Sequence, residues 1–377
     1  MSHETPTCLA DYETLAQQVL SPQTWAYLQS GAADQLTFVR NQQAFTDIRL
    51  CPRHLQNMQG GNTALDLFGT KLDYPILIAP VAYQKLAHPD GEQACALAAS
   101  AMRATMVVST LSSTTLEDIA NTASSPLWFQ LYLQTEQADS LALIRRAEEA
   151  GYRALVITVD AALNGCRNAE QRAGFVLPDH ISAVNLDGRK LPAHGLSVPA
   201  GASLFQNPAL ARLHDWSDIE WVVAHTRLPV LIKGILAPQD ARRAIQAGAA
   251  GMIVSNHGGR VLDTVPASIE ALPAVVEAAG TTPVLLDGGI RRGTDVLKAL
   301  ALGARAVMLG RPIIHGLAAN GPSGVAHVMH ILRTEFEMAM VQCGCRSVSD
   351  IDASVLWPAG GPGLNRTSCA TDAAHSK

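Results

Sequence analysis

The stretch PVLIKG, residues 229–234, is a short apolar run that ends in a lysine and a glycine. It is apolar without alternation, which is typical of a strand buried on both faces in a parallel sheet. One run of this kind does not distinguish a strand from part of a buried helix. Similar runs elsewhere in the chain therefore decide the fold.

Seven further runs recur along the chain, each followed by a turn of small residues and a segment of helical period. They are PILIAP (75–80), MVVST (106–110), LWFQLY (127–132), ALVITVD (154–160), GMIVSN (251–256), PVLLDG (283–288) and AVMLGR (306–311). Intervening helices such as QADSLALIRRAEEAG are long enough to connect parallel strands. Eight βα units predict an α/β fold, a closed (β/α)8 TIM barrel. The alternative, a doubly wound open sheet, lacks its GxGxxG fingerprint here.

The whole chain, residues 1–377, is predicted to form one domain around this barrel. Residues 1–73 are predicted to form a cap of helices and two short strands, FTDIRL (45–50) and ALDLFG (64–69), that closes the bottom of the barrel. Residues 172–215 exceed an ordinary βα connection, and we interpret them as a partly disordered flap loop over the active site. Residues 358–377 are interpreted as a tail.

Composition excludes several classes of protein. The chain is 48% hydrophobic and 16% charged, with a net charge of −5 and no basic stripe, so we expect no nucleic-acid partner. Its first residues lack the basic and apolar regions typical of a signal peptide, and it has no run of about 18 apolar residues, so we expect no membrane segment. The seven cysteines are scattered and odd in number, which is typical of a cytoplasmic protein. No cluster has metal-ligand spacing, and we expect no metal.

Polar residues at the ends of the runs are candidates for the active site, because such barrels carry their sites at the carboxyl ends of the strands. DGGIRRG (287–293) and LGRP (309–312) follow the last two strands, where glycine amides and arginines often bind phosphate. Lys233 ends an apolar strand, where a buried ammonium needs an anionic partner. That partner is either a ligand or a carboxylate at the rim of the barrel.

The stretch VSNHGGRVLD (254–263) places His257 directly after the sixth run, within two residues of Ser255. On an extended strand end these two side chains would point to the same side. His257 by itself could be a core histidine, but Asp160 at the end of the fourth run could orient the imidazole. Arg167 and Arg260 supply guanidinium groups suited to a carboxylate. A base beside two arginines that can bind a substrate carboxylate indicates oxidation or enolisation at the α-carbon of that substrate.

These motifs, in this order, resemble the FMN-dependent α-hydroxy acid oxidising family, which includes glycolate oxidase, lactate oxidase, and lactate and mandelate dehydrogenases. The resemblance runs from DYETLA to about GCRSVSDI and includes APVAYQKLAHPDGE, FQLY, SNHGGRVLD and LDGGIRRGTDVLKALALGA. It implies FMN as the cofactor and the oxidation of an (S)-2-hydroxy acid to the 2-oxo acid. We expect O2 as the electron acceptor and hydrogen peroxide as a product, and the resemblance further implies a homotetramer.

The resemblance also implies roles for single residues. His257 matches the catalytic base, and Asp160 matches the carboxylate that supports its imidazolium. Tyr132 matches the tyrosine near the reacting hydroxyl, and Lys233 matches the lysine at the flavin N1–C2 edge. The other residues that match the FMN site are Pro80, Val81, Ala82, Ser109, Gln130, Thr158, Ser255, Asp287, Gly288, Gly289, Ile290, Arg291, Gly310 and Arg311.

The substrate side of the site both matches the family and departs from it. Tyr27, Arg167 and Arg260 match the groups that hold the substrate carboxylate. Leu111 stands where glycolate oxidase has a tryptophan, and Asn164 stands where it has a leucine. These departures predict a wider and more polar pocket, and hence a larger or more polar substrate than glycolate.

Other functions stay open from the residues alone. A dehydrogenase of the same family would pass its electrons to a quinone or a cytochrome instead of O2. A non-redox isomerase or aldolase could use the same barrel and phosphate site, with Lys233 as a Schiff-base candidate. A third alternative is a degenerate flavoprotein that only binds its ligand.

Overall fold

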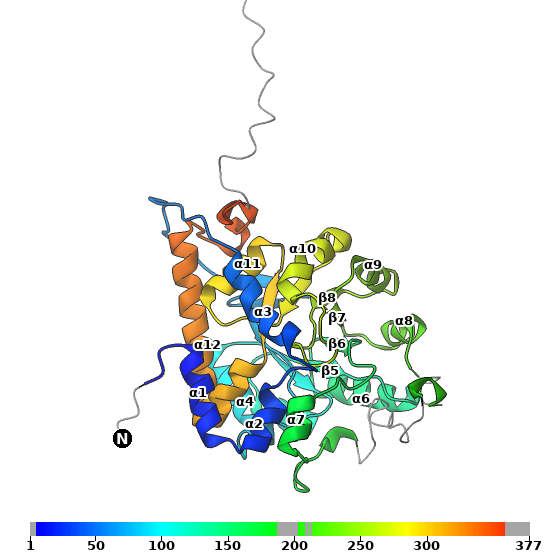
Figure 1. The fold of residues 1–377 in the computed structure, drawn as a ribbon. Helices are drawn as coiled ribbons and strands as arrows, with labels where there is room; N and C mark the ends of the chain where they lie inside the picture. The colour runs from blue at the N-terminus through cyan, green and yellow to red at the C-terminus, as the bar shows by residue number, and fades with distance from the viewer. Residues whose placement is uncertain (1–4, 187–202, 208–209, 211–212, 359–377) are drawn as a thin grey trace, which may run out of the picture.

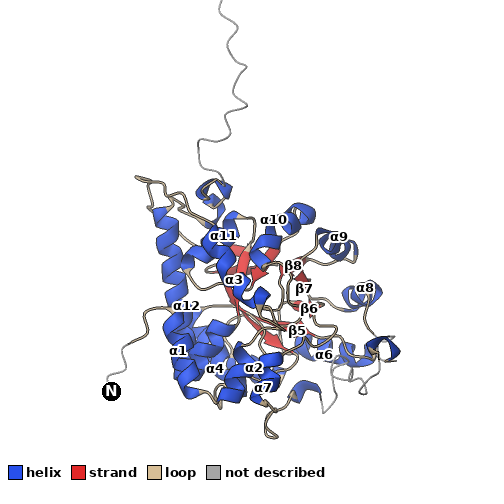
Figure 2. Cartoon of the chain, viewed as in Figure 1, coloured by secondary structure: helices blue, strands red, loops and turns tan. Residues whose placement is uncertain are grey.

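Eight parallel strands close into a barrel in the computed structural model of the chain, which describes residues 5–186, 203–207, 210 and 213–358. Helices surround the strands (Figures 1 and 2). The barrel order is β10-β3-β4-β5-β6-β7-β8-β9. The strands are β3 (Ile76–Ile78), β4 (Met106–Ser109), β5 (Leu127–Leu131), β6 (Leu155–Thr158), β7 (Val230–Ile235), β8 (Gly251–Val254), β9 (Val284–Asp287) and β10 (Ala306–Leu309). Each predicted run contains one strand, which confirms the (β/α)8 barrel.

Side chains along each barrel strand alternate between two hydrophobic clusters, because successive residues of a strand point to opposite faces. The barrel interior is filled by Leu77, Val107, Trp128, Val156, Leu231, Ile253, Leu285 and Met308. The neighbouring residues, such as Ile76 and Ile78, pack in the other cluster with the helices. On six of the strands, the residue two positions after the interior side chain is polar. These residues are Ser109, Gln130, Thr158, Lys233, Ser255 and Asp287. The apolar interior therefore ends in a polar layer at the carboxyl ends of the strands.

The outer ring consists of helices that each follow one barrel strand; all but the last of them lead to the next strand. They are α4 (Gly91–Met102), α5 (Leu116–Thr122), α6 (Gln137–Glu149), α8 (Trp216–His225), α9 (Pro238–Gln246), α10 (Ser268–Ala279), α11 (Gly293–Ala301) and α12 (Arg311–Gln342). A shorter helix, α7 (Asn168–Ala173), follows β6. Helix α12 is kinked where Asn320 and Gly321 leave helical geometry. Short 3-10 helices span Gln84–Leu86, Val184–Leu186, Leu204–Gln206, Val348–Asp350 and Ala353–Val355.

The N-terminal segment contains α1 (Leu9–Val19), which packs on α12, then α2 (Pro22–Gln29) and α3 (Leu36–Asp47). An antiparallel hairpin of β1 (Leu65–Leu67) and β2 (Thr70–Leu72) follows. Its leucines join the barrel interior, and Phe68 in its turn packs edge-on against Trp128, with ring centroids 5.8 Å apart. The hairpin thus covers the end of the barrel opposite to the polar layer.

One of the two predicted N-terminal strands is wrong. Within FTDIRL, Phe45 to Asp47 form the last turn of α3. The buried residues of α3 are Thr37, Asn41, Ala44 and Phe45, whose spacing is that of one helical face. Helical burial therefore outweighs the β-rich composition of the stretch. The strand within ALDLFG is confirmed as β1.

Parts of the predicted flap loop and tail, residues 187–202, 208–209, 211–212 and 359–377, lie outside the described residues. None of the helices in the described part of the chain is long and apolar enough to cross a membrane.

Candidate active site

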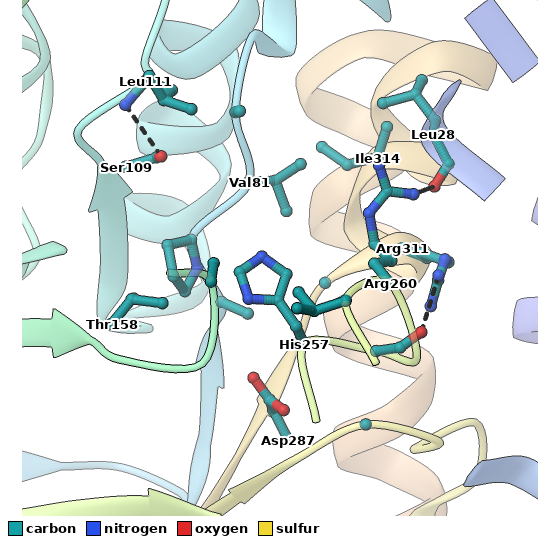
Figure 3. Close-up of a pocket in the computed structure, with 18 of the residues that line it drawn as sticks. Leu28, Val81, Ser109, Leu111, Thr158, His257, Arg260, Asp287, Arg311 and Ile314 are labelled. Atoms are coloured by element: carbon teal, nitrogen blue, oxygen red, sulfur yellow. Dashed lines mark hydrogen bonds between the residues drawn. The ribbon is translucent and has the colours of Figure 1, made fainter. Parts of the chain in front are cut away.

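A cavity of about 470 Å³ opens at the carboxyl ends of the barrel strands (Figure 3). All predicted site residues line it except Asp160 and Ser255, which lie behind the lining in contact with His257. The lining includes Tyr27, Pro80, Val81, Ala82, Ser109, Leu111, Gln130, Tyr132, Thr158, Asn164, Arg167, Lys233, His257, Arg260, Asp287, Gly288, Gly289, Ile290, Arg291, Gly310 and Arg311. The barrel thus brings together residues that are far apart in the sequence.

His257 lies between two groups with different functions. Its Nδ1 atom is 2.8 Å from Oδ1 of Asp160, and its Nε2 atom is 3.5 Å from the hydroxyl of Tyr132. The predicted extended geometry is wrong, because β8 ends at Val254 and His257 has a left-handed φ of 57°. Instead, the Ser255 hydroxyl accepts a hydrogen bond from the backbone N–H of His257 at 3.0 Å and supports the turn. In the view of Figure 3, the imidazole lies between Thr158 and Arg260.

The surroundings of Asp160 keep it ionised as a carboxylate. Burial alone would raise its pKa, but His257 and Lys233 outweigh burial and lower the pKa below its ordinary value. Its second oxygen, Oδ2, is buried and has no hydrogen-bond partner among the described residues. Gly234, with a φ of 111°, makes room for it, because a Cβ atom there would lie 2.6 Å from Cβ of Asp160. The LIKG stretch therefore needs its glycine beside the carboxylate.

Lys233 is a buried cation with two partners. Its Nζ atom is 3.1 Å from Asp287 and donates a hydrogen bond to Ser255 at 2.9 Å. Burial would lower its pKa, but the charges of Asp287 and Asp160 outweigh burial and raise it. Of the two predicted partners, the carboxylate at the rim is confirmed as Asp287, and Lys233 also lines the cavity in which a ligand would lie.

Arg167 and Arg260 both line the cavity, as predicted for a carboxylate site. Arg260 donates to the carbonyl of Ser30 at 2.8 Å, and its guanidinium carbon is 5.4 Å from the centre of the Tyr27 ring. Burial and the like charge of Arg167 lower the pKa of Arg260 to about 10. Gly165 allows their loops to approach, because a Cβ atom there would meet the Arg260 carbonyl oxygen at 2.4 Å. Arg167 and Arg260 are half-buried and repel each other, and although Arg167 also pairs with Glu170 at 3.4 Å, the two guanidinium groups favour an anionic ligand beside them.

Comparison with known proteins agrees with this geometry. A family model described as FMN-dependent dehydrogenase matches residues 16–358. The chain belongs to this family. It is 47% identical to an L-lactate oxidase of Alicycliphilus denitrificans over 92% of this chain and 95% of that protein. It is 44% identical to a glycolate oxidase of Spinacia oleracea over 92% and 95%. A solved mandelate oxidase with (S)-2-phenylpropionate is 43% identical, with a TM-score of 0.84 over 93% of this chain and 98% of that one.

The cavity fits the cofactor of an FMN-dependent dehydrogenase. Several of its buried polar atoms have no hydrogen-bond partner among the described residues: Gln130 Nε2, Asp287 Oδ1, Arg291 Nε and Arg311 Nε. Such atoms cost free energy unless a ligand satisfies them. Burial and neighbouring cations lower the pKa of Arg311 well below its ordinary value, so this end of the cavity favours a phosphate. Gln130 and Asp287, in the polar layer, can serve the polar edge of the ring system.

Some residues in and around the cavity were not predicted from the sequence. Phe175, in the segment interpreted as a flap loop, lines the cavity and stacks on Tyr27, with ring centroids 4.4 Å apart. Glu92, completely buried in α4, accepts hydrogen bonds from Gln84 and Ser113 and so joins the loops after β3 and β4. The HPDGE motif contained a signal for Glu92, since a carboxylate beside an apolar helix face needs partners. No local pattern indicated Phe175.

Proposed function

We propose that this protein oxidises an (S)-2-hydroxy acid to the corresponding 2-oxo acid, with FMN as cofactor, O2 as electron acceptor and hydrogen peroxide as product. The observation that carries the proposal is the arrangement of His257, whose Nδ1 is fixed by Asp160 while its Nε2 lies toward Tyr132. The relatives named L-lactate oxidase and glycolate oxidase support the same reaction class.

The pair of His257 and Asp160 forms a general base. The ionised Asp160 can only accept, so Nδ1 of the neutral imidazole carries its proton and Nε2 presents a lone pair. Nε2 can therefore take a proton from a 2-hydroxy acid in the cavity. The resulting imidazolium is stabilised by the adjacent carboxylate.

The cations of the cavity have separate functions. Arg167 and Arg260 bind the substrate carboxylate and so present the α-carbon to the base. Lys233 provides a fixed positive charge in the polar layer, where negative charge develops during oxidation. Bound FMN supplies the two-electron redox chemistry that no side chain of the chain can perform.

The non-redox alternative is not favoured by the geometry of Lys233. A Schiff-base lysine must lose its proton at neutral pH, which requires a lowered pKa. The pKa of Lys233 is raised by Asp287 and Asp160, so its amine stays protonated. The ion pair instead suits a fixed cation beside a redox cofactor.

The substrate is proposed to be larger or more polar than glycolate. Leu111, which is 8% exposed, and Asn164 line the cavity with Tyr27 and Phe175. A leucine leaves more space than the tryptophan of glycolate oxidase, and an amide provides a hydrogen-bonding group for the substrate side chain.

Anaerobic mixing with 2-hydroxy acids of graded size tests the proposed reaction. The purified protein should be yellow, lose its flavin absorbance with an (S)-2-hydroxy acid, and regain it on aeration with one hydrogen peroxide per substrate. Bleaching with no peroxide on aeration would contradict the oxidase proposal and favour a dehydrogenase. An acid series without any bleaching would contradict the reaction class.

The setting of the enzyme is also part of the proposal. We infer a homotetramer, which the family resemblance supports, and a cytoplasmic location. All six described cysteines are free, as expected in a reducing compartment. Light scattering of the purified holoprotein tests the first inference: a monomer at micromolar concentration would contradict it.

A further inference from the structure

A histidine lies at the phosphate end of the cavity. His315, in the second turn of α12, lines the cavity and is 2% exposed. Its ring is tilted against that of Trp25, with centroids 5.5 Å apart. It lies four residues after Arg311, on the same side of the helix, where a ligand held by Arg311 is within reach of the next turn.

A chain of hydrogen bonds determines which nitrogen of His315 carries the proton. The Gln29 amide donates from Nε2 to the Glu13 carboxylate at 2.6 Å, which fixes the orientation of the amide. Its oxygen, Oε1, therefore lies toward His315 Nε2, at 3.1 Å. Because a carbonyl oxygen only accepts, Nε2 must donate. In the neutral ring, Nδ1 is thus the unprotonated nitrogen, and no described residue hydrogen-bonds to it.

The charged groups around His315 favour the neutral ring as long as no anion is present. Arg311 belongs to the same helix, and Arg291 comes from the loop after β9. Helix α2 contributes uncharged groups, and the Glu13 carboxylate of α1 reaches the ring only through Gln29. Burial and the two arginines lower the pKa of His315 to about 3. A phosphate with up to two negative charges would reverse the sign of the local field.

We propose that His315 is a third, pH-dependent ligand of the FMN phosphate, which takes up a proton on Nδ1 when FMN binds and then acts with Arg291 and Arg311. The proton comes from solvent, and no covalent bond changes. The inference rests on the FMN dependence of the family and not on which acid the enzyme oxidises.

Because proton uptake by His315 is coupled to FMN binding, the direction in which FMN affinity changes with pH can be predicted. FMN binding raises the pKa of His315, so the gain in FMN affinity is fully present at low pH. It is lost as the pH rises through the pKa that His315 has in the holoprotein. A residue that merely packed against the cofactor would change FMN affinity equally at every pH.

FMN release from the diluted holoprotein tests the proposal without any activity measurement. Free FMN is measured by its fluorescence from about pH 5.5 to 8.5 for the wild type, His315→Phe and the control His327→Phe. His327 lies on the same helix, bonded to Tyr12 and away from the cavity. The Kd ratio of His315→Phe to wild type should be about tenfold or more at low pH and within about twofold at high pH. The ionisation of free FMN cancels in the ratio.

A Kd ratio of His315→Phe to wild type that does not change with pH would overturn the proposal. An equal pH dependence of the Kd ratio for His327→Phe would also overturn it. If His315→Phe does not fold, His315→Gln replaces it, because an amide can hydrogen-bond but cannot take up a proton, and the same slope is expected. Riboflavin, which has no phosphate, provides the second arm: its Kd ratio should be flat with pH. If the Kd ratio for riboflavin depended on pH as strongly as the ratio for FMN, the phosphate could not be the partner of His315.

Discussion

Replacing Asp160 with asparagine removes the charge behind His257 while preserving the shape of the side chain. Oδ1 of Asp160 lies 2.8 Å from Nδ1 of His257, and the Asp160 side chain is 13% exposed. The asparagine oxygen can still accept from Nδ1, so the orientation of the ring is retained if the amide nitrogen faces away. What the variant loses is the stabilisation of the imidazolium that forms as the proton is transferred.

The size of this loss follows from the geometry. Two unit charges about 4 Å apart at an effective dielectric constant near 20 interact with about 4 kcal/mol, which is an upper limit. A charge-assisted hydrogen bond contributes about 1.5–3 kcal/mol. Since about 1.4 kcal/mol corresponds to tenfold in rate, Asp160→Asn should slow the reduction of FMN by about 10- to 1000-fold.

Anaerobic stopped-flow spectroscopy at saturating 2-hydroxy acid measures this rate as the loss of flavin absorbance. The matched control is Asp240→Asn, which removes an exposed carboxylate from a second cavity, of about 450 Å³, that Asp160 also lines. This control should reduce its FMN at the wild-type rate. A rate for Asp160→Asn within twofold of the wild type would refute the function of Asp160 in stabilising the imidazolium.

Three further changes test other parts of the structure. Arg260→Lys should raise KM about 10- to 100-fold and change kcat less, because an ammonium cannot form the paired hydrogen bonds of a guanidinium; steady-state kinetics measure the split. Leu111→Trp should lower kcat/KM for bulky 2-hydroxy acids at least tenfold relative to glycolate, as measured in a substrate series; an unchanged preference would contradict the position of Leu111. Asp263→Asn should lower the free energy of unfolding by about 2 kcal/mol at pH 7, because Asp263 accepts from the backbone N–H groups of Leu36 and Thr37. Burial would raise the pKa of Asp263, but these hydrogen bonds outweigh burial and lower it. The difference in free energy of unfolding between wild type and variant, measured with urea, should therefore shrink below about pH 4. A difference that stays constant with pH would contradict the contact of an ionised Asp263.

The barrel could be predicted from the sequence because its pattern is local. Each strand is a continuous apolar run, and the polar residue after it lies two positions beyond an interior side chain, as for Leu231 and Lys233. The motif DGGIRRG likewise indicated a phosphate site at one end of the cavity, and its Arg291 lines that cavity. Residues at strand ends were therefore expected to share one rim, and the structure brings them around one cavity.

The parts that could not be predicted depend on contacts across the chain or on backbone details. The stacking of Phe175 on Tyr27 joins the segment after β6 to α2, and no local spacing encodes it. The left-handed backbone of His257 cannot be read from a periodicity that assumes an extended strand. FTDIRL was misjudged because Phe45 completes the buried face of α3, which is decided by packing and not by the β propensity of its residues.

The base function of His257 is tested most directly by the anaerobic reduction of FMN in His257→Gln. Glutamine can hydrogen-bond to Asp160 but cannot accept a proton, so the variant should keep its yellow colour and its FMN. Its reduction by a 2-hydroxy acid should be slower than in the wild type by about 1000-fold or more. FMN reduction near the wild-type rate would contradict the proposal that this cavity acts through His257.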